Sequence, residues 1–321
     1  MRTLLLAAAA AAIGLTTPTL ARAEDETVAM FTKNQTNPFF AAERIGAEKA
    51  AAMLHVKLLE YVPTKADSIA EQMSQIDDVV VKKPGAVVIV PVDYKAIGPG
   101  IARLNAAGIP VVNVTDRSAE GRFISFVGAN DRDIARDTAE VLLKAMGGKG
   151  SVVILEGVPG SLTSQDRVRG FRDALKDFPG VKLVATQPAN YQRLQGMQVM
   201  ENLLQSHPDV AGVMAANDAM AIGAMDALND AGQKALVIGI NATKEAVDAI
   251  KAGRMLASGD YNGFLQGCIG TMIAVRHLRH EPIAADVQLP VVVVTKANAQ
   301  AYDTPVQQRS CPTWNEVAGH S

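Results

Sequence analysis

The chain has 321 residues, of which 48% are hydrophobic, and its 31 basic and 33 acidic side chains leave a net charge of −2. Its length favours about two domains, and its composition is apolar enough to fill large cores. A slightly acidic chain without a cluster of basic residues excludes an ordinary nucleic-acid-binding protein.

The chain begins with the features of a secretory signal peptide. Arg2 precedes an apolar stretch from Leu4 to Leu15, and Ala21-Arg22-Ala23 has the small-residue spacing of a cleavage site. The stretch is too short and too rich in alanine to indicate a membrane span. We expect cleavage after Ala23 and export to the periplasm. The alternative is a buried N-terminal helix.

From residue 27 onward, apolar runs typical of buried strands alternate with segments of helical spacing. The predicted strands are Thr27–Phe31, Lys57–Tyr61, Ala86–Val90, Pro110–Val114, Ser151–Leu155, Val181–Ala185, Gly212–Ala215 and Ala235–Ile240. The predicted helices are Phe39–Leu54, Ser68–Val81, Tyr94–Ala107, Arg132–Met146, Gln165–Asp177, Leu194–Gln205, Ala219–Ala231 and Thr243–Lys251. Glycines suited to a helix C-terminal cap, such as Gly108 and Gly232, follow several of these helices.

This alternation predicts an α/β protein with right-handed βαβ units and parallel sheets that helices cover on both faces. The units are too many for one ordinary doubly wound sheet, so two similar lobes are the economical interpretation. No linker rich in Pro, Gly or Ser separates the lobes. We therefore expect several short chain crossings, with Gly128-Ala129-Asn130 as one candidate.

Polar and aromatic side chains follow the predicted strands, where open parallel sheets bind their ligands. The positions are 34–40, Asp93, Asp116-Arg117, 156–167, 187–191, Asn217-Asp218 and Asn241. Amides, carboxylates and guanidinium groups together suit a neutral polyhydroxyl ligand, because each hydroxyl both donates and accepts hydrogen bonds. Aromatic residues make up only 4% of the chain, so Phe39-Phe40 stands out as a platform for the ligand's C–H face.

Five short motifs occur in order along the chain. They are Asn37-Pro38-Phe39-Phe40, Ile109–Val112 leading to Asp116-Arg117, Asp166–Phe171, Gln187–Tyr191, and Pro208–Val210 leading to Asn217–Gly223. With these motifs the mature chain resembles the ribose-type periplasmic sugar-binding proteins of ABC importers over nearly its whole length. The resemblance implies the type I fold of that family, with two doubly wound parallel-sheet lobes, three hinge crossings and a ligand in the cleft between the lobes.

The resemblance also implies how the chain is divided. The expected parts are a signal peptide over 1–23, an N-terminal lobe over 24–129 plus 262–289, a C-terminal lobe over 130–261 plus 290–311, and a tail over 312–321. The tail after Lys296 is longer than this family needs. Cys268 and Cys311 either form one disulfide in an oxidising compartment or are two buried free thiols.

The resemblance further implies a set of ligand-binding residues. They are Asn37, Phe39, Phe40, Asp116, Arg117, Arg167, Tyr191, Asn217, Asn241 and Tyr261, with Lys33, Asn34 and Asp260 as further candidates. In this scheme the amides, Asp116 and the two arginines bind hydroxyls, and the aromatic rings enclose the sugar ring. The alternatives are a core anchor for Phe40, a helix N-cap for Asp116 and surface salt bridges for the arginines.

Two positions depart from the family pattern. Asn241 stands where ribose and galactose binders place an aspartate, and Tyr261 aligns with a glutamine of the family. An amide at 241 loses a charge-assisted hydrogen bond, and Asp260 is the candidate for the lost acceptor. These changes put ribose itself in doubt and leave pentitols, tetritols, inositols and other pentoses or hexoses open.

We therefore expect an exported solute-binding protein that captures a small sugar or sugar alcohol and delivers it to an ABC permease in the inner membrane. We expect a monomer without catalytic residues, cofactor, metal or nucleic-acid partner. The first alternative is a periplasmic sugar sensor for chemotaxis or a sensor kinase. A sugar-responsive repressor would need a DNA-binding motif where the signal peptide lies. An enzyme could pair aspartates such as Asp93 and Asp218, but the common catalytic motifs are absent from the sequence.

Overall fold

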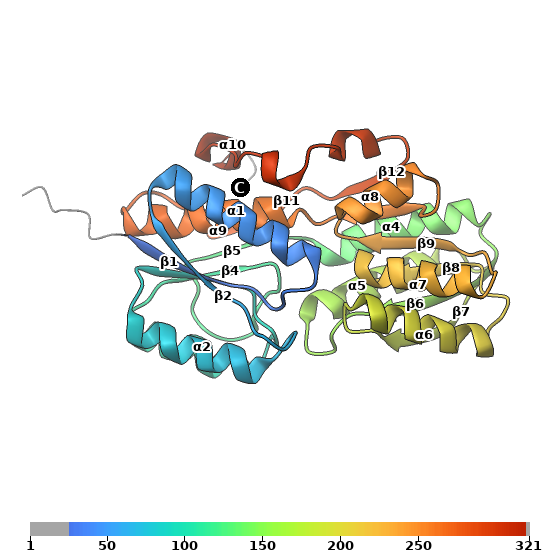
Figure 1. The fold of residues 1–321 in the computed structure, drawn as a ribbon, viewed down its shortest axis with the longest axis horizontal. Coiled ribbons are helices and arrows are strands. Elements are labelled where there is room, and N and C mark those ends of the chain that lie inside the picture. Colours follow the sequence, from blue (N-terminus) through green and yellow to red (C-terminus); the bar gives the residue numbers. More distant parts are fainter. Residues whose placement is uncertain (1–25, 319–321) are drawn as a thin grey trace, which may run out of the picture.

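The computed structural model describes residues 26–318, which form two α/β lobes lying end to end (Figure 1). The first sheet has the strand order β11-β5-β4-β3-β1-β2, and all of its pairings are parallel. Its strands are β1 (Thr27–Phe31), β2 (Lys57–Tyr61), β3 (Ala86–Ile89), β4 (Val111–Val114), β5 (Ser125–Ala129) and β11 (Asp286–Leu289). The predicted signal peptide lies outside the described residues.

The second sheet has the order β12-β10-β9-β8-β6-β7, and only its edge strand β12 runs antiparallel to its neighbour. Its strands are β6 (Gly150–Glu156), β7 (Val181–Pro188), β8 (Gly212–Ala215), β9 (Leu236–Ile240), β10 (Ala257–Asp260) and β12 (Val292–Thr295). The predicted architecture of two doubly wound, mainly parallel lobes is confirmed.

Helices cover the sheets because alternate strand residues point to opposite faces. Val28 and Met30 of β1 belong to one core, whereas Ala29 and Phe31 belong to another. The helices of the first lobe are α1 (Pro38–Leu54), α2 (Ile69–Lys82), α3 (Gly98–Ala106) and α9 (Gly263–Leu278). The helices of the second lobe are α4 (Asp131–Ala145), α5 (Leu162–Lys176), α6 (Arg193–Ser206), α7 (Asp218–Asp230) and α8 (Lys244–Lys251). Among residues 26–318, no helix combines the length and hydropathy that a membrane span needs.

The chain passes between the two sheets three times, after β5, after β10 and between β11 and β12. Their number is that of the three hinge crossings implied by the resemblance, and the first of them follows the candidate crossing at 128–130. The predicted helix start at Tyr94 is wrong, because α3 begins at Gly98. The backbone before it turns around Asp93, whose Oδ1 accepts hydrogen bonds from the amides of Lys95 and Ala96.

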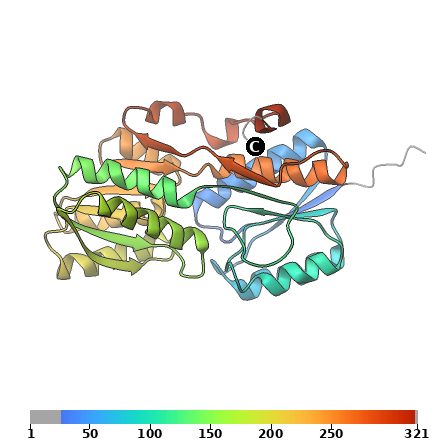
Figure 2. The same cartoon turned by 180° about the vertical axis from the view of Figure 1, so that it is seen from behind.

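After β12 the tail returns across both lobes (Figure 2). It contains two 3-10 turns, η1 (Ala299–Tyr302) and η2 (Val306–Gln308), and the short helix α10 (Trp314–Ala318). Cys311 of the tail forms a disulfide with Cys268 of α9. Of the two alternatives for the cysteines, the structure has the disulfide.

Candidate functional site

A small cavity lies between the lobes, beyond the carboxyl ends of strands from both sheets. Its lining residues are Lys33, Asn37, Phe39, Phe40, Thr115, Asp116, Thr163, Arg167, Tyr191, Asn241 and Tyr261. Its volume is about 20 Å³, enough for about one water molecule. The cavity is small because the lobes touch around it. The amide of Thr163 donates to Asp116 Oδ1 at 3.3 Å, and the amide of Tyr94 donates to the Gly160 carbonyl at 3.0 Å.

Two phenylalanines of the first lobe are positioned by the start of α1. Asn37 is the N-cap, and its side-chain oxygen accepts a hydrogen bond from the Phe39 amide at 3.0 Å. Pro38 follows at the first helical position, where its fixed φ suits the helix. The rings of Phe39 and Phe40 pack edge to face with centroids 5.3 Å apart, and Phe39 also lies 5.7 Å from the Tyr261 ring. The local sequence therefore places an aromatic wall at the cavity.

The first lobe also contributes a buried ion pair. Lys33 Nζ lies 2.6 Å from Asp116 Oδ2, and the two side chains are only 3% and 1% exposed. Burial disfavours the charged lysine, but the attraction of Asp116 and Asp67, together with the hydrogen bond to Asp116, outweighs burial and raises the pKa of Lys33 above its usual value. Lys33 therefore stays charged, and an ammonium group has three protons to donate.

In the second lobe, Arg167 of α5 joins the residues at the cavity through its hydrogen bonds. Its Nε donates to Asp131 Oδ1 at 2.8 Å, and its Nη1 donates to the Ala216 carbonyl at 2.8 Å and to Asn241 Oδ1 at 3.4 Å. The guanidinium lies 4.4 Å from the Tyr261 ring centre. Burial raises the pKa of Asp131 to about 6, although Arg167 opposes this shift. The arginine is thus held by four neighbours from different parts of the lobe.

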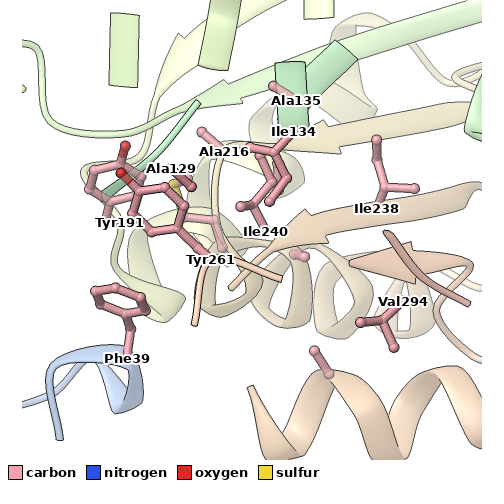
Figure 3. Close-up of a cluster of buried hydrophobic side chains, with 14 of the residues drawn as sticks. Phe39, Ala129, Ile134, Ala135, Tyr191, Ala216, Ile238, Ile240, Tyr261 and Val294 are labelled. Atoms are coloured by element: carbon pink, nitrogen blue, oxygen red, sulfur yellow. The ribbon is translucent and has the colours of Figure 1, made fainter. Parts of the chain in front are cut away.

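Two tyrosines complete the lining, and they lie near Phe39 (Figure 3). The Tyr261 hydroxyl is 2.8 Å from both Asp131 Oδ2 and the Thr115 carbonyl. The Tyr191 hydroxyl is buried and has no hydrogen-bond partner among the described residues. Burial raises the pKa of Tyr191 to about 12, so this hydroxyl keeps its proton at neutral pH. An unpaired buried hydroxyl costs about 1–3 kcal/mol, which a ligand that bonds to it would recover.

Four predicted site residues are not brought to the cavity. Arg117 is about half exposed, pairs with Asp286 at 2.6 Å and lies over the Phe126 ring, beside a second cavity of about 380 Å³ near β11. The salt-bridge alternative therefore describes Arg117. Asn217 caps α7, where its side chain accepts from the Met220 amide and donates to the Tyr191 carbonyl.

The other two predicted residues outside the cavity, Asn34 and Asp260, form hydrogen bonds with other parts of the protein. Asn34 accepts a hydrogen bond from the Asn37 amide and donates to Asp67. Asp260 accepts from the Asn262 amide and from the Tyr302 hydroxyl of the tail, so it does not supply the acceptor missing at Asn241. The other predicted residues line the cavity, and their contact with a ligand stays a prediction.

The predicted set of ligand-binding residues omits Thr115, Thr163 and Asp131, although Thr163 falls in the polar stretch 156–167. Thr115 has a positive φ of 64°, which aims the backbone after β4 at the cavity, but threonine carries no pattern that signals this conformation. Thr163 lies on α5 near its Ser161 N-cap, a start that the sequence analysis placed three residues too late. Asp131 begins α4 directly after the crossing at 128–130 and could have been found as a charged residue beside a predicted hinge.

Behind Thr115 lies a buried carboxyl group. The Thr115 hydroxyl is 2.7 Å from Glu43 Oε1 and 2.7 Å from Gln266 Oε1. A hydroxyl has one proton and the glutamine oxygen can only accept, so Thr115 donates to Gln266 and a protonated Glu43 donates to Thr115. Burial raises the pKa of Glu43 to about 8, in agreement with this arrangement.

Comparison with known proteins adds to this geometry. Residues 28–282 match a family model described as a periplasmic binding protein domain. The ribose import binding protein RbsB of Haemophilus influenzae is 30% identical over 92% of this chain and 100% of its own length.

Two solved structures have the same fold. A periplasmic solute-binding protein of an ABC transporter from Actinobacillus succinogenes, with bound D-allose, is 31% identical with a TM-score of 0.82 and covers 86% of this chain and 99% of its own. A myo-inositol-binding protein from Caulobacter, bound to myo-inositol, is 31% identical with a TM-score of 0.81. The match covers 87% of this chain and 96% of that protein's chain.

Proposed function

Since the chain belongs to the family of periplasmic binding protein domains, we propose that it captures a small sugar or sugar alcohol between its lobes and delivers it to an ABC importer. The observation that carries this proposal is the interlobe cavity, where aromatic rings and hydrogen-bonding groups from both lobes meet. The relatives named above, a ribose import binding protein and a solute-binding protein of an ABC transporter, favour this role over the sensor alternative.

The charges around the cavity support a neutral ligand. Lys33 is paired with Asp116, and Arg167 is paired with Asp131. Each positive side chain is therefore already balanced by a carboxylate, so an anionic ligand would compete with a buried carboxylate in either case. Hydroxyl groups can bond to the remaining protons and lone pairs of these groups without carrying a charge into the cavity.

The relatives bind ligands of the same chemical class, namely ribose, D-allose and myo-inositol. We propose a pentose, hexose, inositol or sugar alcohol for this chain. Asn241 and Tyr261, the two departures from the family pattern, both line the cavity and are therefore placed to select among these ligands. Tyr261 is 1% exposed and fills volume that a smaller side chain would leave to the ligand.

We propose the following sequence of events for binding. A cavity of about 20 Å³ cannot admit a sugar, so the lobes separate, the ligand enters, and the lobes close again. Asn37, Phe39, Phe40 and Asp116 would contact it from the first lobe, and Arg167, Tyr191 and Asn241 from the second. Closure favours binding because only the closed arrangement brings both sets to the ligand.

The remaining parts of the proposal concern processing and assembly. We propose lobes of 24–129 plus 262–289 and of 130–261 plus 290–295. The expected extension of the second lobe to 311 does not fit the tail, because η2 packs on α1 and Cys311 is bonded to Cys268 of α9, both in the first lobe. The signal peptide would be cleaved after Ala23, leaving the mature protein in the periplasm as a monomer that docks on the permease. The protein would release its ligand chemically unchanged, without catalysis.

A thermal-unfolding screen with pentoses, hexoses, inositols and sugar alcohols tests the ligand class. A true ligand at a hundredfold excess over its Kd stabilises the folded state by about 2.7 kcal/mol. Asp116→Asn should lose this stabilisation, whereas Arg117→Ala, one residue further and outside the cavity, should keep it. If no compound of these classes stabilises the wild type, the sugar-binding proposal is wrong.

A further inference from the structure

The tail crosses the hinge region and touches both lobes (Figures 1 and 2). It leaves β12 in the second sheet, and η1 packs on α8 of the second lobe. It then continues to the first lobe, where η2 packs on α1 and the Cys268–Cys311 disulfide joins it to α9. We call residues 296–318 the strap.

The second-lobe end of the strap is hydrogen-bonded to one of the three hinge crossings. The Tyr302 hydroxyl donates to Asp260 Oδ2 at 3.0 Å, while Asp260 Oδ1 accepts from the Asn262 amide at 2.8 Å. Asp303 forms an ion pair with Lys251 of α8. The strap is therefore attached to α8 and to the crossing at 260–262, which carries Tyr261 into the cavity.

The first-lobe end is attached by a covalent bond and by packing. Cys268 is fully buried within α9, and Cys311 is bonded to it. Three residues further, the Trp314 ring lies 4.3 Å from the Arg276 guanidinium on the same helix. Val317 is 3% exposed. This end therefore moves with the first lobe.

We propose that the strap is a fourth connection between the lobes that limits their opening and thereby favours the closed arrangement. Asp303 and Cys311 are eight residues apart, so the chain between the two attachments spans at most about 28 Å even when it is fully extended. The attachments on both lobes exist together in the closed arrangement. Rigid-body separation of the lobes stretches the strap or detaches one of its ends.

Two consequences follow from this connection. Interactions made only in the closed arrangement raise the affinity for any ligand that binds between the closed lobes. A dithiol such as dithiothreitol, which is oxidised to its cyclic disulfide as it reduces Cys268 and Cys311 to two thiols, removes the covalent attachment of the first-lobe end and leaves only its packing. The extent of lobe opening is then sensitive to thiol reductants.

Small-angle X-ray scattering of the protein without ligand tests the strap directly. The double variant Cys268→Ser/Cys311→Ser should have a larger radius of gyration than the wild type. Dithiothreitol should enlarge the wild type similarly and leave the double variant unchanged. Gln300→Ala, at an exposed position of the same tail, is the matched control and should scatter as the wild type does.

A second variant releases the other end while the disulfide stays intact. Tyr302→Phe/Asp303→Asn should also enlarge the radius of gyration, and circular dichroism establishes that each variant is folded. For a sugar identified in the screen, either release should weaken affinity about three- to tenfold, because the closed population falls. Radii and affinities equal to those of the wild type in the folded variants would overturn the proposal. The scattering needs no sugar, so a failure of the sugar-binding proposal is seen separately.

Discussion

The two walls of the cavity are built in different ways. The first-lobe wall uses residues close together in sequence, since Asn37, Phe39 and Phe40 share the start of α1, and one ion pair completes it. In the second-lobe wall, Arg167 is held by groups from α4, from the end of β8 and from the end of β9. One wall depends on a local helix start and the other on long-range packing, so we expect them to respond differently to substitution.

Arg167→Ala should have the largest effect, because it removes the group around which the second wall is organised. The variant leaves the buried Asp131 carboxylate without its partner, which costs about 3–5 kcal/mol of folding free energy. Ligand binding should be lost as well. Urea denaturation and isothermal titration calorimetry measure the two effects. Arg169→Ala, two residues along α5 at an exposed ion pair, is the control. It should change the free energy of unfolding and the free energy of ligand binding by less than about 1 kcal/mol each.

The second test separates binding from stability in the first wall. Lys33→Met leaves Asp116 buried without its ion-pair partner, which should lower the free energy of unfolding by about 3 kcal/mol. The same variant should also lose ligand binding. In Lys33→Met/Asp116→Leu both charges are gone, so stability should return to within about 1 kcal/mol of the wild type while binding stays lost. Recovery of binding in the double variant would mean that the ion pair does not contact the ligand.

The smallest effect, taken per pH unit, is a pH dependence behind the first wall. The folded state holds the Glu43 proton up to a pKa of about 8, whereas an unfolded chain releases it near 4.5. The free energy of unfolding therefore falls between these values as pH rises, by up to about 1.4 kcal/mol per pH unit from this group. Glu43→Gln should lose this slope. Denaturation curves from pH 5 to 9 measure it, with Glu201→Gln on the exposed face of α6 as the control.

Most of the fold could be predicted from the sequence because its strands are short apolar runs separated by amphipathic helices. Among the elements not predicted individually were β5, β10, α9 and β11. Helix α9 is buried on nearly all sides, so it has no polar face to give a helical period. It also packs so closely on α1 that a side chain at Gly267 would clash with the backbone at Glu43. A sequence pattern does not reveal such a contact.

The site was predicted where local sequence determines it. Phe39 and Phe40 follow from an N-cap and a proline, and both line the cavity. Arg117 shows the limit of this reasoning. It follows Asp116 directly, but the positive φ of Thr115 turns the chain so that one side chain enters the cavity and the next pairs with Asp286 on β11. That partner is 169 residues away in sequence.

The interleaved order of the two sheets has a consequence for how the chain matures. The first sheet gains its edge strand β11 only at residue 289, and the second gains β12 only at residue 295. Helix α9, which covers the first sheet, is also made after ten of the twelve strand segments have passed. During synthesis from the N-terminus, neither core can therefore be closed until almost the whole polypeptide has emerged. Completion of the two lobes is a single late event, so truncation before β11 would leave both sheets without an edge strand rather than one intact lobe.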